Sequence, residues 1–132
     1  MIIARSKTIS AKIIIVDDEK SIVEEVLETL TAEGYQCFGA SGVDAAVELV
    51  TTEIGIDLIV TDLRMPKKTG ADLIKTIETK WGQQIKFIVM SGHASPGIEY
   101  SGIDIASYPF LKKPVDIDDL IDTVACVLEV RG

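Results

Sequence analysis

The sequence predicts an α/β fold in which a doubly wound parallel sheet carries helices on both faces. Two observations lead to this fold class. Five short apolar segments alternate along the 132 residues with five segments of helical pattern. The apolar runs, such as IIIV and FIVM, are nearly uninterrupted, which is typical of strands buried on both faces. Strict β-α alternation then implies right-handed crossovers between parallel strands.

The expected strands are these short apolar runs. They cover Lys12–Val16, Gln36–Ala40, Asp57–Thr61, Lys86–Met90 and Tyr108–Leu111. Between the first two, apolar residues at Val23, Val26, Leu27 and Leu30 follow the i, i+3, i+4, i+7 spacing of an amphipathic helix, and Gly34 supplies its C-terminal stop.

Polar residues indicate where the later helices begin. Ser41 with Asp44, and Thr69 with Asp72, resemble capping boxes before the second and third helices. The last helix is expected to start near Asp116.

The fourth helical segment, GHASPGIEYSGIDIASYPF, has an anomalous composition. Pro96 and Gly97 begin it, Gly102 interrupts it, and its apolar residues fit no single helical stripe. We therefore expect a fourth helix of at most two short turns, or an irregular and mobile segment, with a short rigid helix as the alternative.

Length, charge and hydropathy restrict the classes of protein to which this chain can belong. The chain suits one compact domain over residues 11–132, with residues 1–10 as a flexible extension. A net charge of −8 argues against nucleic-acid binding. No apolar run approaches the roughly 20 residues of a membrane helix, and the start lacks a signal-peptide core, so we expect a cytoplasmic protein.

Cys37 and Cys126 are expected to be buried thiols.

Polar side chains follow four of the five strands. These are Asp17 and Asp18, Asp62, Ser91, and Lys112 with Lys113. Ligands of open α/β sheets bind beyond the carboxyl ends of the strands. If the four strands are neighbours, three carboxylates converge and need a cation. An all-oxygen ligand set favours Mg²⁺ or Mn²⁺ over zinc. A metal ion, a lysine, a hydroxyl and a free carboxylate together suit phosphoryl transfer.

These strand ends also carry a resemblance. The segments VDDE, DLRMPKKTG, MSGH and FLKKP, in this order and spacing, resemble the receiver domain of two-component response regulators over Lys12 to Val130. The resemblance implies the flavodoxin-like strand order 2-1-3-4-5, which makes the four strands neighbours.

The resemblance assigns a role to each acidic residue. Asp62 would be the phosphoacceptor for a phosphohistidine of a sensor histidine kinase or phosphotransfer protein. Asp17 and Asp18 would hold Mg²⁺ together with Asp62 and the backbone carbonyl of Arg64. Arg64 and His93 would stand at the rim, where side chains tune the lifetime of the phosphate.

The resemblance also assigns roles after the last two strands. Lys113, joined to Pro114 by a cis peptide bond, would pair with the phosphoryl oxygens, while Lys112 faces solvent. Ser91 would donate its hydroxyl to the phosphate, and Phe110 would be the aromatic that changes rotamer. A downstream protein would bind the face formed by helix 4, strand 5 and helix 5.

The leading interpretation is therefore a phosphoaccepting switch rather than an enzyme, with weak self-phosphorylation and slow self-dephosphorylation. One alternative is a receiver domain excised from a larger response regulator or hybrid histidine kinase. A haloacid-dehalogenase-like phosphatase needs an acid where this chain has Arg64. A flavin-binding module needs a phosphate-cradling loop where this chain has three acids. A receiver that has lost phosphorylation is a further alternative.

Overall fold

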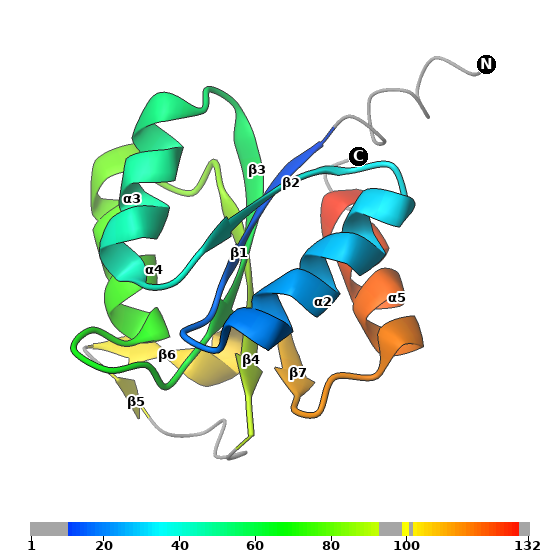
Figure 1. Cartoon of the computed structure of the whole chain (residues 1–132). Coiled ribbons are helices and arrows are strands. Elements are labelled where there is room, and N and C mark those ends of the chain that lie inside the picture. Colours follow the sequence, from blue (N-terminus) through cyan, green and yellow to red (C-terminus); the bar gives the residue numbers. More distant parts are fainter. Residues whose placement is uncertain (1–10, 93–98, 101, 130–132) are drawn as a thin grey trace.

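The fold is a five-stranded parallel sheet between two layers of helices (Figure 1). The computed structural model describes residues 11–92, 99–100 and 102–129. The strands of the sheet are β1 (Lys12–Val16), β2 (Gln36–Ala40), β3 (Ile56–Asp62), β4 (Lys86–Ser91) and β7 (Phe110–Lys112). The described α-helices are α2 (Lys20–Ala32), α3 (Val43–Thr52), α4 (Gly70–Trp81) and α5 (Ile117–Glu129). The strand order β2-β1-β3-β4-β7, with every pair parallel, confirms the expected order.

Both faces of the sheet are apolar and covered. Ile14 and Ile59 belong to the core beneath α3 and α4, whereas Ile13 and Val60 belong to the core beneath α2 and α5, and all four are fully buried. This two-sided burial explains why the strands read as continuous apolar runs. Among the described residues, no helix has the length and apolar character needed to cross a membrane.

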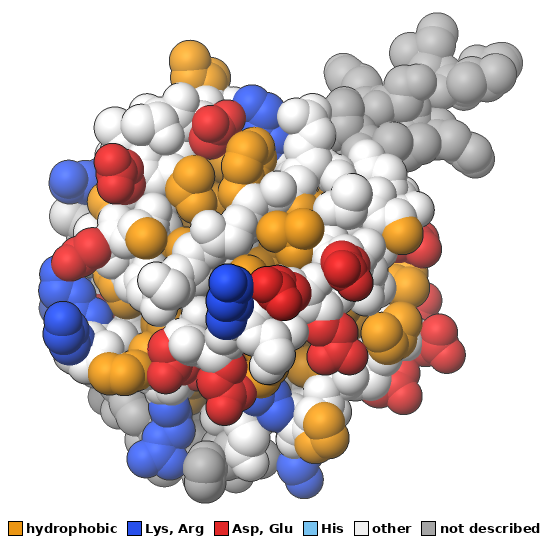
Figure 2. All heavy atoms as spheres, viewed as in Figure 1, with side chains coloured by type: hydrophobic (Ala, Val, Ile, Leu, Met, Phe, Trp, Pro, Cys, Tyr) orange, Lys and Arg blue, Asp and Glu red, His pale blue; other side chains and the backbone are white. Residues whose placement is uncertain are grey.

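The flank formed by α2 and α5 is acidic (Figure 2). Exposed carboxylates lie along both helices: Glu24, Glu25, Glu28, Asp118, Asp119 and Asp122. Figure 2 shows red, acidic side chains over this flank, and the carboxylates of the two helices contribute to the net charge of −8.

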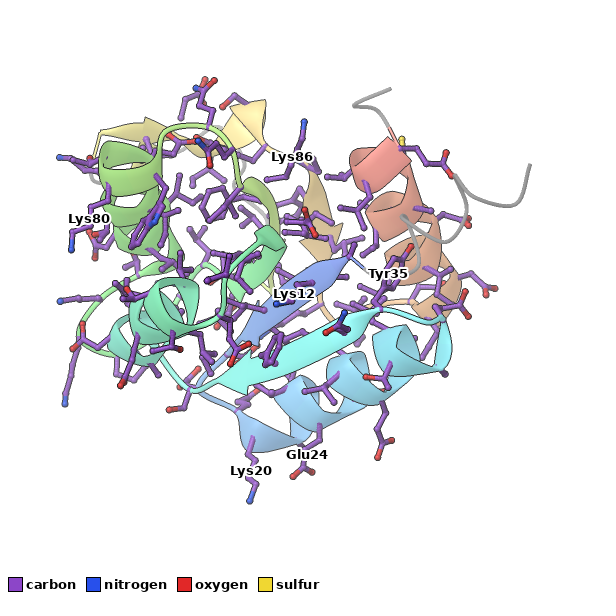
Figure 3. The ribbon with its side chains drawn as sticks, turned by 90° about the horizontal axis from the view of Figure 1, so that it is seen from above. Lys12, Lys20, Glu24, Tyr35, Lys80 and Lys86 are labelled. Carbon is purple, nitrogen blue, oxygen red and sulfur yellow. The ribbon has the colours of Figure 1, made fainter. Side chains whose placement is uncertain are left out.

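The two ends of the sheet differ in character. Figure 3 looks onto the end where Lys12 and Lys86 begin β1 and β4. There, the backbone N–H of Lys12 donates to Asp57 Oδ2 at 3.0 Å, and Lys12 Nζ donates to the carbonyl of Ile54 at 2.8 Å. Asp57 therefore belongs to the strand entrance, away from the residues that follow the carboxyl ends of the strands.

One of the two expected capping boxes is present. The Asp72 N–H donates to Thr69 Oγ1 at 3.2 Å, and the Thr69 N–H donates to Asp72 Oδ2 at 2.8 Å, so α4 begins as expected. The prediction of a capping box formed by Ser41 and Asp44 was wrong.

Helix α3 begins one residue later than that capping box required. Its N-cap is Gly42, which is fully extended at φ −176° and offers no side-chain hydrogen bond. Asp44, in the first turn of α3, instead accepts a 2.9 Å ion-paired hydrogen bond from Lys68 Nζ.

The structure corrects the expected fourth helix. The segment before β7 contains a short antiparallel ribbon, β5 (Glu99–Tyr100) paired with β6 (Ile103–Asp104), and then a 3₁₀ turn, η1 (Ile105–Ser107). Residues 93–98 and 101 lie outside the described residues. Gly102, at φ 81°, is suited to the tight reversal between the two strands. Four α-helices are thus described, not five.

The ribbon segment is fastened to α4. Ile105 is fully buried in the core under α3 and α4. The Tyr108 hydroxyl donates to Glu78 Oε2 of α4 at 3.0 Å, and its ring meets Phe87 edge to face with centroids 6.2 Å apart. Burial and this carboxylate partner raise the pKa of Tyr108 to about 12. Tertiary packing therefore supplies the order that helix propensity does not.

The two cysteines differ from expectation. Cys37 is half-buried, and burial raises the pKa of its thiol, but Cys126 is exposed. Cys126 follows the fully buried Val124 by two positions, a rotation of about 200° around the helix, which turns it outward from α5.

The first residue of α4 lies directly against the end of β3. A Cβ atom on Gly70 would stand 2.4 Å from the carbonyl oxygen of Asp62 and 3.1 Å from the Cα of Leu63. The Gly70 N–H donates to the Leu63 carbonyl at 2.9 Å, and the Leu63 N–H donates to the Met90 carbonyl at 2.9 Å. These contacts therefore fix the position of the first turn of α4 relative to the backbone that follows β3.

We predict that Gly70→Ala destabilises the protein by about 2 kcal/mol, because the methyl group forces the Asp62 backbone to move. Helix propensity alone predicts the opposite sign, a gain of about 1 kcal/mol from replacing glycine in a helix. Urea unfolding measures the difference. Gly92→Ala is the matched control, since a Cβ there would meet only the Lys113 Cβ at 3.9 Å. A Gly70→Ala protein as stable as the control variant would contradict the steric account.

Candidate functional site

Three carboxylates meet beyond the carboxyl ends of β1 and β3. One oxygen each from Asp17, Asp18 and Asp62 lies within 4.8 Å of the other two. Asp17 is fully buried and Asp62 is 5% exposed, whereas Asp18 is open to solvent. The parallel pairing of β1 with β3 produces this convergence, because it brings the ends of both strands to the same edge of the sheet.

Asp17 is held in place from both sides. Its backbone N–H donates to the Ala40 carbonyl at 3.1 Å, which ties the end of β1 to β2. Its Oδ1 accepts a hydrogen bond from the Glu19 N–H at 2.9 Å. The second oxygen, Oδ2, faces the site.

Lys113 brings the positive charge to the carboxylates. Its Nζ lies 2.6 Å from Asp17 Oδ2 and 3.2 Å from Asp62 Oδ1, and its side chain is 16% exposed. The Lys113 N–H also donates to the Ser91 carbonyl at 2.9 Å, and the Lys113–Pro114 peptide bond is cis. The neighbouring Lys112 is exposed, as expected.

The charges in the site do not balance. Burial and the charge of Asp17 outweigh the opposing effect of Lys113, and together they raise the pKa of Asp62 to about 6. Burial lowers the pKa of Lys113, but the hydrogen bond to Asp17 and the charge of Asp62 outweigh it, so the net shift is upward. One ammonium therefore faces three carboxylates, and a further cation would favour the ionised form of Asp62.

The donor set fits a hard divalent cation. The cluster consists of carboxylates, whose oxygens are the ligands that Mg²⁺ and Mn²⁺ prefer. The open side of the cluster faces a hollow of about 320 Å³. Its lining includes Asp18, Asp62, Arg64, Ser91 and Lys113. This arrangement leaves room for a small anionic group beside the metal position.

The structure brings together most of the residues expected at the site. Ser91 ends β4 and is buried, and Arg64 is exposed at the edge of the hollow. Phe110 lies beside Val89 in the β4–β7 pairing and is half-buried against the core under α3 and α4. His93 lies outside the described residues.

Sequence reasoning missed two residues that contact the backbone of Asp62. Gly70 packs on its carbonyl oxygen, as described above. Thr61, fully buried, donates its Oγ1–H to the same oxygen at 2.9 Å. The position of Gly70 directly after the loop could have indicated a close backbone contact. Thr61, in contrast, looks in the sequence like an ordinary strand residue.

Comparisons with known proteins agree with this geometry. The family model of the response regulator receiver domain matches residues 13–125. Sporulation initiation phosphotransferase F of Bacillus subtilis is 29% identical, over 92% of this chain and 96% of that protein. The hydrogenase transcriptional regulatory protein HoxA of Cupriavidus necator is 31% identical, but this chain spans only 25% of its length.

The fold comparison gives the same family. The crystal structure of a response regulator receiver protein from Pseudomonas putida matches with a TM-score of 0.77 and 30% identity. The match covers 87% of this chain and 95% of that one. With the family model spanning most of the chain, this protein belongs to the response regulator receiver domains of two-component signal transduction.

Proposed function

We propose that this receiver domain is a phosphoaccepting switch in which Asp62 takes a phosphoryl group from a phosphohistidine of a sensor histidine kinase or phosphotransfer protein. One observation carries the proposal: the Asp62 carboxylate shares a single open site with two further carboxylates and the Lys113 ammonium. A carboxylate kept only for capping a turn would not need such partners.

The transfer step makes one bond and breaks one. A carboxylate oxygen of Asp62 bonds to phosphorus while the phosphorus–nitrogen bond of the phosphohistidine breaks, and its electron pair stays on the imidazole nitrogen. Lys113, 3.2 Å from Asp62, is positioned to pair with the phosphoryl oxygens. The Ser91 hydroxyl would donate to one of them. Catalysis then rests on positioning and charge stabilisation.

The metal would be held by Asp17, Asp18, Asp62 and the backbone carbonyl of Arg64. Mg²⁺ or Mn²⁺, when bound, neutralises the charge of the phosphoryl oxygens. Asp17 Oδ2 now accepts from Lys113 at 2.6 Å, so Lys113 and the cation compete for this carboxylate. Relieving that competition would leave the ammonium free for the phosphoryl group.

The later steps of the switch depend on residues around the rim. Arg64 and His93 would set how slowly the aspartyl phosphate hydrolyses. Phe110 would change rotamer as Ser91 engages the phosphate. The output face would then comprise β7, α5 and the ribbon of β5 and β6, which stands where a fourth helix was expected.

The relatives support two places for the switch in a signalling pathway. The chain matches nearly all of one relative and a quarter of another. The same switch thus suits a single-domain phosphorelay protein with residues 1–10 as an extension, or the receiver part of a larger regulator or hybrid kinase. We propose a cytoplasmic location, and the acidic flank disfavours direct contact with nucleic acid.

We predict that acetyl phosphate with Mg²⁺ adds one acid-stable, base-labile phosphoryl group to the protein, and that Asp62→Asn abolishes it. Intact-mass spectrometry reads the adduct. Asp57→Asn is the matched control, because Asp57 is an exposed aspartate near the opposite end of β3. A modified Asp62→Asn protein, or an unmodified wild type, would refute the assignment.

We predict that Asp18→Ala removes divalent-metal binding while the fold stays intact. Mg²⁺ at a hundred times its dissociation constant should stabilise the wild type by about 2.7 kcal/mol in urea unfolding and leave Asp18→Ala unchanged. Without metal, the variant should be as stable as the wild type or more so, because carboxylate repulsion is relieved. Asp122→Ala, which removes an exposed carboxylate of α5, should keep the full metal effect. Stabilisation of Asp18→Ala by Mg²⁺ would count against this metal site.

We predict opposite effects of Lys113→Met on metal binding and on phosphorylation. Loss of the competing ammonium should tighten Mg²⁺ binding about fivefold. Loss of phosphoryl stabilisation should slow phosphorylation on the order of 10²-fold. Isothermal titration calorimetry and quenched-flow mass spectrometry measure the two quantities. Lys112→Met, at an exposed neighbour, should change neither. If Lys113→Met weakens metal binding, the two cations do not compete.

A further inference from the structure

The hydroxyl of Thr61 is a buried polar group next to the proposed phosphoacceptor. Thr61 is fully buried, and its Oγ1 donates to the backbone carbonyl of the next residue, Asp62, at 2.9 Å. A valine would fill almost the same space and suits a strand interior better. The hydroxyl therefore needs a reason beyond packing.

The bond acts on a peptide group that is held from its other side as well. The peptide between Asp62 and Leu63 has its carbonyl on the Thr61 hydroxyl and its N–H on the Met90 carbonyl at 2.9 Å. Gly70 packs against that same carbonyl oxygen, and its N–H donates to the following carbonyl, that of Leu63, at 2.9 Å. These contacts fix the rotation of the backbone on the C-terminal side of Asp62.

The relative positions of the two proposed metal ligands of this loop depend on that rotation. The Asp62 side chain branches from the Cα atom that precedes the fixed peptide. The Arg64 carbonyl lies two peptide groups further along the chain. A rotation about the Cα–C bond of Asp62, which turns this peptide, would leave the Asp62 Cβ in place but swing the Arg64 carbonyl relative to the Asp62 carboxylate. Asp17 would not follow, because its backbone N–H and its Oδ1 have their own partners in Ala40 of β2 and in Glu19.

We propose that Thr61 is a positioning residue of the phosphoacceptor site: its hydroxyl sets the orientation of the Asp62–Leu63 peptide, and thereby holds the Arg64 carbonyl and the Asp62 carboxylate in the relative positions that a shared metal ion requires. This inference rests on the proposed function, because it concerns the geometry of that metal and phosphoryl site. It does not require Thr61 to touch either ligand.

A purely structural role makes a different prediction. If the hydroxyl serves only to satisfy a buried carbonyl, its loss lowers the stability of the folded protein and leaves the binding properties of the folded molecules unchanged. If it sets the relative positions of the Asp62 carboxylate and the Arg64 carbonyl, its loss weakens metal binding in protein that is still folded. The metal dissociation constant separates the two roles, and it does not depend on phosphorylation.

The test compares Thr61→Val with wild type, with Thr61→Ser as the variant that keeps the hydroxyl. Isothermal titration calorimetry gives the Mn²⁺ dissociation constant, and acetyl phosphate kinetics give the saturating rate and the half-saturating concentration. Thr79→Val is the matched control, since Thr79 Oγ1 donates to the Lys75 carbonyl at 2.7 Å on the exposed side of α4. If Thr61→Val fails to fold, Thr61→Ala against Thr61→Ser isolates the hydroxyl at equal loss of the methyl group.

We expect Thr61→Val to raise the Mn²⁺ dissociation constant and lower the saturating phosphorylation rate, each by roughly five- to tenfold. The half-saturating concentration should change less than twofold, and Thr61→Ser should restore both wild-type values within about twofold. Thr79→Val should match the wild type. Unchanged metal binding in folded Thr61→Val, or in Thr61→Ala where the valine variant fails to fold, would overturn the inference. A wild type that binds Mn²⁺ but takes no phosphoryl group would refute the proposed function instead, while the metal arm would still decide the role of Thr61.

Discussion

The concentration of negative charge at the end of β1 and β3 is the constraint on which the rest of the site depends. Two carboxylates about 4 Å apart repel each other by roughly 4 kcal/mol at an effective dielectric near 20. Here three share one corner, and two of them are buried. Lys113 offsets part of this repulsion by contacting both Asp17 and Asp62. The remaining repulsion suits the site to a divalent cation, and a bound cation would in turn suit it to the phosphoryl group that we propose it accepts.

The fold keeps these charges together through backbone contacts. The Lys113 and Leu63 N–H groups bond to the carbonyls of Ser91 and Met90 at the end of β4, so three neighbouring strands fix one another. Gly70 allows α4 to start against the Asp62 carbonyl without a side chain in between. These backbone contacts therefore hold the carboxylates in place against their mutual repulsion. The site has a defined geometry before any ligand binds.

The sequence predicted the sheet and the acidic site because both leave local signals. Continuous apolar runs marked the strands, and polar residues at their ends marked Asp17, Asp62 and Lys113. The ribbon before β7 was missed, although Tyr100 and Ile103 flank a Ser-Gly dipeptide in the sequence, because a helix of at most two short turns or an irregular segment was expected there. Thr61 was invisible for another reason: its contact depends on which way one peptide points. Such a rotation has no periodic signature.

The most direct test of the charge account is a crystal structure of the protein grown with Mn²⁺ and measured at a wavelength where manganese scatters anomalously. The account predicts one anomalous peak among the carboxylates of Asp17, Asp18 and Asp62, with the Arg64 carbonyl turned toward it and Lys113 Nζ withdrawn from Asp17. A peak elsewhere on the acidic surface, or an empty corner with Lys113 still bonded to Asp17 at saturating Mn²⁺, would contradict it.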